Sequence, residues 1–200
     1  MILWTIQSVA AWSRLQREGV LRADGRRVHG RYRQAYEWLA QQMAERLGCR
    51  PSENTLPLWA WFQWKEATCR RPDLRSCGYL PPGDRGVRIE FEISSRLVLL
   101  SDFDLWHYAL NHWYLPESQQ DDEDFESELS RRGLSFYQDK PLRDAASHRR
   151  ITESWSRIFD LDWTDRDQSI ARPRAKKSIQ ASFWELRAEQ VRLVQLFTAR

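Results

Sequence analysis

A short polar segment interrupts an otherwise apolar stretch in the middle of the chain. It contains Ser101, Asp102 and Asp104, and Trp106 and His107 follow it directly. Two carboxylates beside an imidazole are the residue types of general acid–base catalysis, and a carboxylate can also hold a ribose hydroxyl. Because His107 comes three residues after Asp104, the two side chains fall on one face of a helix that starts here. The segment is therefore a candidate ligand site at the end of a strand.

The same residues also have a purely structural explanation. Asp104 is expected to cap a helix, because a carboxylate at a helix N-terminus contributes about 0.3 to 1 kcal/mol without any function. His107 has no visible nucleophile as a partner, so a histidine held by a structural hydrogen bond also explains its presence. Both explanations stay open at the level of the sequence.

Arginines supply a second set of candidates, for binding phosphate. Arg71, Asp73 and Arg75 lie in a turn-rich segment, residues 70–86, which we expect to be a surface loop. Loops carry many binding residues, and the arginine fork matches phosphate, so Arg71 or Arg75 either recognises phosphate or is simply solvated. Arg22, which follows the first predicted helix, has the position of a pyrophosphate clamp or of one more solvated arginine.

The composition favours a nucleotide or nucleic-acid partner without requiring one. The 31 basic residues include only four lysines, yet the net charge is +3, so no global field attracts polyanions. Genomic base composition explains the arginines equally well. The chain has 11 tryptophans. Most must be core residues, but Trp59, Trp61 and Trp64 are candidates for stacking on a base.

Several classes of protein lack support in this sequence. It contains no P-loop, GxGxxG, HExxH or GxSxG motif, which leaves kinase, dehydrogenase, zincin and hydrolase assignments without a basis. Cys49, Cys69 and Cys77 have no metal-ligand spacing, so we expect reduced thiols and no metal. No apolar run approaches the roughly 20 residues of a membrane span. The first residues lack the pattern of a signal peptide, and we expect a cytoplasmic protein without membrane contact.

Periodicity and capping residues predict an α+β fold in a single domain, residues 1–200. Ser8 is the expected cap of the first helix, and Gly19 is expected to end it. The segment 87–93 alternates, with Val87, Ile89 and Phe91 inward and the charged residues between them outward. Strands are expected at residues 3–7, 56–65, 87–93, 97–100, 178–186 and 190–197. Helices are expected at residues 8–18, 30–47, 125–134 and 147–159 and after Asp104, with an acidic loop at 116–124.

Six short motifs resemble a known bacterial family, domain of unknown function 3841. They are spread over nearly the whole chain and are specific when taken together, although the family name implies no reaction. The motifs are WTIQ at residues 4–7, AYEWL at 35–39, PLWAWF at 57–62, RPDLR at 71–75, LLSDFDLWHYALN at 99–111 and IQASFWEL at 179–186.

The opening LWTIQSVAAWSRLQREGVL also resembles ADP-ribosyltransferase-like domains, especially the DNA-modifying toxin branch. This resemblance implies a split sheet with helices packed around it, and NAD as the substrate. It further implies transfer of ADP-ribose to a nucleic acid or protein, as in a bacterial toxin or phage-defence effector. Transferred to this sequence, it makes Asp102, His107 and Gln180 the catalytic candidates. The implied NAD-binding residues are Trp4, Thr5, Gln7, Arg22, Ser101 and Asp104.

The chain departs from that pattern at an important position. Gln180 stands where such domains have a glutamate, and alternation places Glu185 on the opposite face of a strand from Gln180. Glutamine can orient a sugar but cannot neutralise an oxocarbenium-like transition state. Either Asp102 or Asp104 replaces the missing acid, or the fold has kept a nucleotide pocket without the usual chemistry. The alternatives are a non-catalytic nucleic-acid-binding or protein-interaction module, including a toxin held by an antitoxin partner.

Overall fold

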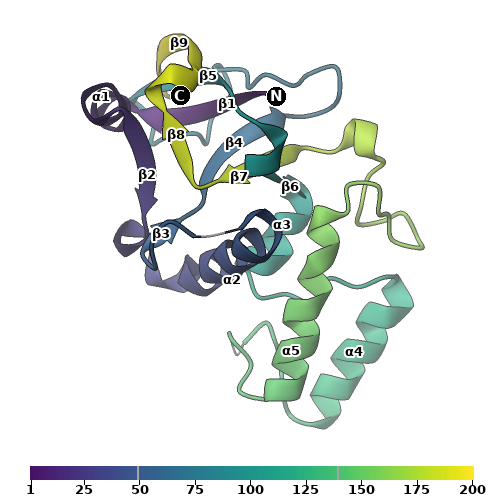
Figure 1. The fold of residues 1–200 in the computed structure, drawn as a ribbon. Helices are drawn as coiled ribbons and strands as arrows, with labels where there is room; N and C mark the ends of the chain where they lie inside the picture. Colours follow the sequence, from purple (N-terminus) through teal and green to yellow (C-terminus); the bar gives the residue numbers. More distant parts are fainter. Residues whose placement is uncertain (49, 139) are drawn as a thin grey trace. The chain divides into compact units, whose positions relative to one another are not determined.

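In the computed structural model, which describes residues 1–48, 50–138 and 140–200, the chain forms two β-sheets and several α-helices (Figure 1). The predicted α+β class is confirmed. The strands are β1 (Ile2–Ser8), β2 (Val20–Asp24), β3 (Thr55–Leu56), β4 (Leu58–Gln63), β5 (Arg85–Glu92), β6 (Leu99–Asp102), β7 (Ile179–Phe183), β8 (Glu185–Arg187) and β9 (Val191–Thr198). The α-helices are α1 (Val9–Glu18), α2 (Gly30–Leu47), α3 (Phe103–Leu110), α4 (Gln119–Arg131) and α5 (Ala145–Ser154).

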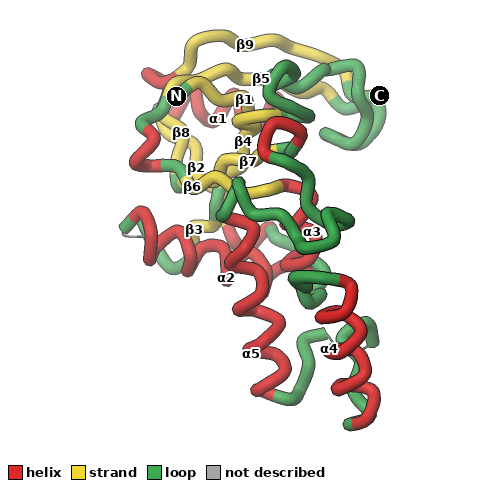
Figure 2. Tube along the Cα trace, turned by 90° about the vertical axis from the view of Figure 1, so that its right-hand side faces the viewer, coloured by secondary structure: helices red, strands yellow, loops and turns green. Residues whose placement is uncertain are grey.

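Where the sequence predicts a single domain, the contacts divide the chain into two compact units. Unit 1 consists of Met1–Leu100 and Ile179–Arg200, and unit 2 of Ser101–Ser178. Unit 2 is therefore an insertion in the chain that starts within β6 and ends just before β7. The strands, yellow in Figure 2, belong to unit 1 apart from the end of β6, whereas α3, α4 and α5 belong to unit 2.

Unit 1 is built on a six-stranded sheet with the order β6-β7-β4-β1-β5-β9. β1 is antiparallel to both β4 and β5, with Trp4 opposite Trp61 on one side and opposite Glu90 on the other. Leu3, Ile89 and Phe91 are fully buried on one face. We call this the inner face, where α1 contributes Leu15 to the core. The opposite face, which carries Trp4 and Glu90, is the outer face. A second sheet, β3-β2-β8, completes unit 1.

The caps of α1 are the predicted ones. Ser8 accepts a hydrogen bond from the backbone N–H of Ala11 at 3.1 Å. Gly19 has a φ of +72°, a left-handed conformation that glycine adopts without steric cost, and its N–H bonds to the carbonyl of Leu15 at 2.9 Å. These local signals make α1 predictable from the sequence alone, whereas the adjoining β2 was not among the predicted strands.

Several predicted elements differ from the structure. The segment 56–65 is not one strand, because it breaks at Pro57 into β3 and β4, and β3 pairs with β2 in the second sheet. The segment 178–186 is not one strand, because it breaks at Trp184 into β7 and β8, and β8 pairs with β2 in the second sheet. The predicted acidic loop at 116–124 in fact contains the first turns of α4, which starts at Gln119 after the cap Ser118. Pairs four residues apart, such as Gln119 with Glu123, stabilise these turns.

Unit 2 has a core of aromatic side chains. Phe125 lies between Tyr114 and Phe136, with ring centroids 4.3 and 5.9 Å away. Trp155 is fully buried at the start of a short 3₁₀ helix, Trp155–Phe159, that follows α5. The imidazole of His112 lies 5.5 Å from the Trp155 ring. Unit 2 thus has a hydrophobic core of its own.

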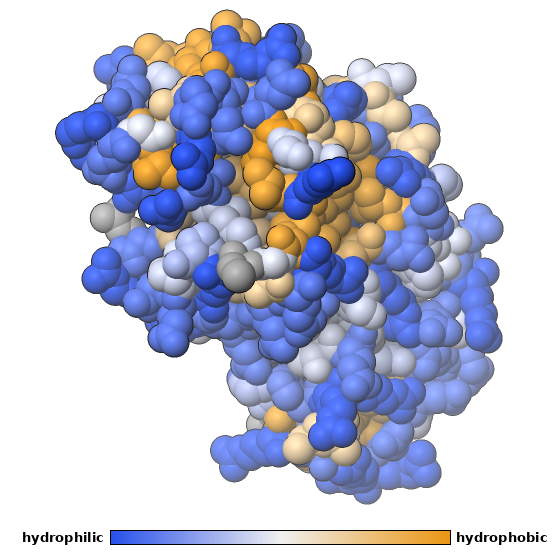
Figure 3. All heavy atoms as spheres, viewed as in Figure 1, coloured by the Kyte–Doolittle hydropathy of each residue, from blue (hydrophilic) through white to orange (hydrophobic). Residues whose placement is uncertain are grey.

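Other predictions concerned cysteines and membranes. Cys69 and Cys77 are free thiols, and Cys49 lies outside the described residues. Among the described residues, no helix is long and apolar enough to cross a membrane. Apolar surface, orange in Figure 3, gathers over β9, where Leu193 and Leu196 are 53% and 56% exposed.

The buried His112 predicts a specific pH dependence of stability. Its side chain is 6% exposed, and its Nδ1 has no hydrogen-bond partner among the residues described. Burial, followed by the nearby His148 and Lys140, lowers the pKa of His112 to about 4. The unfolded chain binds a proton below the ordinary pKa of about 6.5, whereas folded His112 does so only near 4. The free energy of unfolding should therefore fall by roughly 2 to 3 kcal/mol between pH 6.5 and 4.

Urea unfolding of wild type and His112→Asn at several pH values measures the contribution of His112 to the pH dependence of the free energy of unfolding. Asparagine tolerates the left-handed backbone of this position, where φ is +55°. The variant should lose less stability than wild type on acidification, and other titrating groups cancel in the comparison. Equal losses in the two proteins would contradict the assignment.

Candidate functional site

The outer face of β5 carries a buried arginine. Alternation along β5 sends Val87, Ile89 and Phe91 to the core and turns Arg88 to the outer face, as predicted. A charged side chain at an outward position ordinarily meets water, but only 8% of Arg88 is exposed. The reason is that the loop before β5 folds back over the strand and covers the guanidinium.

The partners of Arg88 are neutral. Its guanidinium donates to the carbonyl oxygen of Pro72 at 2.5 Å and to the side-chain oxygen of Gln195 on β9 at 2.6 Å. Within the described part of the chain, no carboxylate forms an ion pair with it. Burial, and next the charge of Arg71, lowers the pKa of Arg88 from its ordinary value. The two bonds occupy two of its five N–H groups, so three remain for another acceptor.

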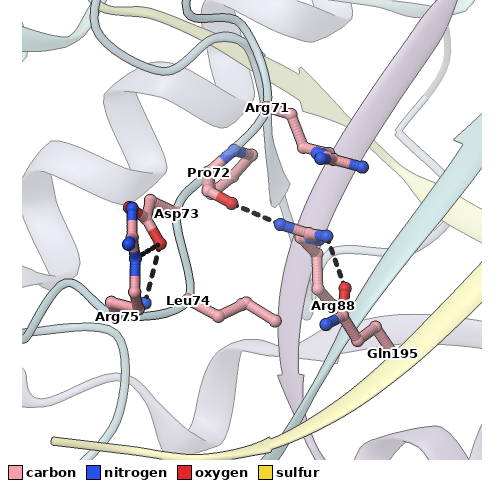
Figure 4. Close-up of a pocket in the computed structure, with 7 residues that line it drawn as sticks. All are labelled: Arg71, Pro72, Asp73, Leu74, Arg75, Arg88 and Gln195. Atoms are coloured by element: carbon pink, nitrogen blue, oxygen red, sulfur yellow. Dashed lines mark hydrogen bonds and ion pairs between the residues drawn. The ribbon is translucent and has the colours of Figure 1, made fainter.

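Arg88 forms part of the wall of a pocket of about 470 Å³ (Figure 4). We call it the arginine pocket. In Figure 4 the Arg88 guanidinium lies between Pro72 and Gln195, and Arg71 extends from the loop beside it. The pocket is lined by Arg71, Pro72, Asp73, Leu74, Arg75, Arg88 and Gln195, all of unit 1. It thus brings together three guanidinium groups and a single carboxylate.

Asp73 and Arg75 form a fork on the rim of the pocket. The closest contact of the two side chains is 2.6 Å, and Asp73 also accepts the backbone N–H of Arg75 at 3.0 Å. The hydrogen bond from the Arg75 side chain is the main reason that the pKa of Asp73 falls to about 2. Nearby, burial and then the charge of Asp73 raise the pKa of Tyr79 to about 12. Asp73 is therefore charged and Tyr79 neutral over the whole physiological pH range.

An aromatic row crosses the same face of the sheet. Trp4 lies opposite Trp61, which in turn lies opposite Gln180 on β7. Trp4 Nε1 donates to the carboxylate of Glu90 at 2.9 Å, and the guanidinium of Arg70 lies 5.7 Å from the Trp4 ring centroid. This row gathers one residue of the first strand and one of the late strand, both predicted as site residues, and it adds Glu90.

Thr5 and Gln7, by contrast, lie on the inner face. The Thr5 hydroxyl donates to the carbonyl of Trp59 at 2.7 Å and accepts from the Gln7 side chain at 2.8 Å. Thr5 is 1% exposed. The structure therefore separates these two predicted residues from Trp4 by the thickness of the sheet, and their polar groups bind one another and the backbone.

Arg22 has an ion-pair partner. Its side chain on β2 donates to Glu185 on β8 at 2.6 Å, and Arg187 donates to the same carboxylate at 2.7 Å. Burial alone would raise the pKa of Glu185, but the hydrogen bonds from the two arginines lower it. In the structure Arg22 thus joins the two strands, and nearly half of its side chain is exposed.

In unit 2, Asp102 is a buried cap and ion-pair partner. It is 2% exposed and accepts the backbone N–H groups of Asp104 and Leu105 at 3.0 and 3.2 Å. The cap of α3 is therefore Asp102, and the prediction that Asp104 caps this helix is wrong. The second oxygen of Asp102 lies 3.2 Å from the ammonium of Lys177, which is 1% exposed.

The other predicted residues of unit 2 have different surroundings. Ser101 is 1% exposed, and its hydroxyl has no partner among the described residues. His107 Nδ1 lies 3.0 and 3.3 Å from the backbone carbonyls of Phe103 and Asp104. The Asp104 side chain borders a pocket of about 430 Å³ shared with Arg172. Burial, and then the charge of Asp102, raises the pKa of Asp104.

Comparison with known proteins establishes the family. A family model described as "Domain of unknown function (DUF3841)" matches residues 2–192. The chain belongs to this family. No curated protein and no solved structure matches it at a significant level. Among the described residues of this DUF3841 chain, no group of three or more His, Cys, Asp and Glu side chains is placed to hold a metal ion.

Sequence reasoning missed Arg88, Gln195 and Lys177 in this DUF3841 chain. Arg88 follows the alternation of a strand, and a charged residue at an outward position ordinarily meets water. Lys177 ends the basic run ARPRAKK at residues 171–177, where charged side chains ordinarily meet water, yet it is fully buried. The loop motif RPDLR was the usable signal, since it pointed to Arg71 and Arg75.

The buried ion pair predicts the effect of Asp102→Asn on stability. Asparagine keeps the helix cap but leaves the Lys177 ammonium buried without its carboxylate, which should cost about 3 kcal/mol. The double variant Asp102→Asn with Lys177→Met should recover much of this loss, because it removes the buried charge as well. Chemical denaturation of wild type, both single variants and the double variant measures the coupling. Losses that simply add would contradict a direct pair.

Proposed function

We propose that the chain binds a phosphate-bearing ligand of the nucleotide class in the arginine pocket. The observation that carries this proposal is the buried Arg88, which has neutral partners and faces a pocket that it shares with Arg71 and Arg75. A bound phosphate would supply the negative charge that Arg71 and Arg88 lack among the described residues, whereas Arg75 already pairs with Asp73.

The electrostatics of the pocket support an anionic ligand. Anchoring the loop to the sheet needs only the hydrogen bonds of Arg88 to Pro72 and Gln195, which a neutral donor also makes. Burying a charged guanidinium costs more free energy than burying a neutral donor, and the positive charge of Arg71 repels that of Arg88. Both effects lower the pKa of Arg88. Like charges gathered at a pocket are stabilised when an anion binds between them.

The geometry also agrees with this class of ligand. Guanidinium groups bind phosphate oxygens through two parallel N–H bonds, and Arg88 has three N–H groups left for this purpose. The aromatic row lies on the same face of the sheet, where Glu90 is two residues from Arg88 along β5. Pockets of about 300 to 1,000 Å³ commonly bury small ligands, and the arginine pocket falls within that range.

Binding of inorganic phosphate and AMP, measured by isothermal titration calorimetry, tests the proposal. Arg71→Gln and Arg75→Gln should each weaken binding at least about tenfold, since each removes one charge-assisted interaction, typically 1.5 to 3 kcal/mol. Arg17→Gln is the matched control. It removes the same charge from an exposed position of α1, which packs on the inner face. No binding by wild type, or equal weakening in the control, would refute the proposal.

A second candidate function is ADP-ribosyl transfer from NAD, the activity that the sequence resemblance implies. The aromatic row favours it, because Trp4 of the first strand and Gln180 of the late strand lie on one face with Trp61 between them. In the reaction, the bond between nicotinamide and ribose breaks and nicotinamide leaves. The ribose carbon then bonds to an acceptor nucleophile of a nucleic acid or protein, which loses a proton. A toxin or phage-defence role and an antitoxin partner belong to this candidate.

Incubation with labelled NAD and a mixture of RNA, DNA and cell lysate tests this second function. Released nicotinamide and labelled acceptor are both expected, and Gln180→Ala should reduce both if Gln180 orients the ribose. Arg17→Gln should leave both unchanged. If NAD is neither bound nor consumed, and no label is transferred, the candidate is excluded.

A further inference from the structure

The charges that line the arginine pocket do not cancel. Arg71, Arg75 and Arg88 are positive and Asp73 is negative, which leaves a charge of +2 at the pocket. Two charged residues outside the lining also interact with it electrostatically: Lys65 with Asp73, and Glu90 with Arg88. Their charges are opposite, so the net charge of +2 is unchanged. The pocket therefore presents three guanidinium groups and an excess of two positive charges.

The protein groups that line this pocket keep their charges between pH 5 and pH 8. Asp73 has a pKa of about 2 and loses its charge only in strong acid. Tyr79, beside the pocket, has a pKa of about 12 and stays neutral. Guanidinium groups remain protonated throughout this range. Any change in affinity between pH 5 and pH 8 must then come chiefly from the ligand.

We infer that the arginine pocket selects the dianionic end of a small phosphomonoester, such as a nucleoside monophosphate, over a phosphodiester. This inference rests on the proposed function and deepens it. A terminal phosphate carries two charges and three unsubstituted oxygens, which match the excess charge and the three guanidinium groups. A diester carries one charge and offers two such oxygens, so one guanidinium group lacks a phosphate oxygen.

The burial of Arg88 makes this discrimination strong. Coulomb interactions grow as the surroundings exclude water, and Arg88 is 8% exposed. The second charge of a monoester acts on this buried group as well as on the exposed Arg71 and Arg75. The Asp73 carboxylate repels each additional ligand charge, but three guanidinium groups outweigh it.

The test compares AMP with its O-methyl phosphodiester by isothermal titration calorimetry from pH 5.0 to pH 7.5. At pH 7.5, AMP should bind at least tenfold more tightly than the methyl ester. The second phosphate pKa is about 6, so at pH 5.0 roughly a tenth of AMP is dianionic. Its affinity should therefore fall about five- to tenfold, since the monoanion still binds as weakly as the ester, whereas the affinity of the methyl ester should stay constant.

Variants check that the pocket is responsible for the difference. Arg71→Gln should weaken the binding of AMP more than that of the methyl ester. The lost positive charge attracts two negative charges on AMP but only one on the ester. Asp73→Asn keeps the oxygen that accepts the Arg75 N–H but removes the negative charge. It should strengthen the binding of AMP more than that of the ester. Arg17→Gln should change neither.

The outcomes separate the two proposals. Equal affinity for AMP and the methyl ester, or an affinity for AMP that does not change with pH, overturns the inference and leaves phosphate binding standing. If neither ligand binds, the proposed function fails as well.

Discussion

The two-residue alternation of β5 determines the rest of unit 1. Val87, Ile89 and Phe91 are fully buried on the inner face, so the residues between them must turn to the outer face. β1 and β9 pair on either side of β5 and fix its register, with Arg88 opposite Gln195. A slip of one residue would place a guanidinium in the core and a valine in the pocket. The hydrophobic core and the arginine pocket are thus two consequences of one strand register.

The loop over the outer face connects the core with the pocket. Arg88 holds it through the carbonyl of Pro72, and Arg70 donates to the carbonyl of Phe62 at 3.0 Å and lies over that ring. Arg71 and Arg75, on the same loop, are exposed and free of this packing role. The buried arginine therefore positions the loop. Arg71 is available for a ligand, and Arg75 is available through the N–H groups that it does not donate to Asp73. An anion that binds all three would also stabilise the folded loop by mass action.

Local signals made much of this fold predictable from the sequence. Features that depend on long-range contacts could not be predicted in this way. Ser8 and Gly19 are residue types that cap helices, so they mark the two ends of α1. The alternation of apolar and charged residues in β5 can be read directly from its sequence. The burial of Arg88 depends on a loop that returns over the strand, and that of Lys177 depends on Asp102, far away in the sequence. The start of α4 was missed, although a helix was predicted from Phe125, because its acidic first turn is stabilised partly by Arg150 of α5, which contacts Asp121. For the site, the loop motif identified Arg71 and Arg75, but no sequence pattern could identify Gln195 as the partner of Arg88.

The two ends of unit 2 are fastened to one another. Asp102 and Lys177 form the buried ion pair, and the N–H of Phe103 donates to the carbonyl of Ser178 at 2.9 Å. The chain thus leaves the sheet at the end of β6 and returns to it at the start of β7 at neighbouring positions. Insertions with neighbouring ends are tolerated well by a host domain, because the host chain needs no rerouting. A short linker could therefore join the end of β6 to the start of β7 in place of unit 2 and leave the path of the chain through the sheet unchanged.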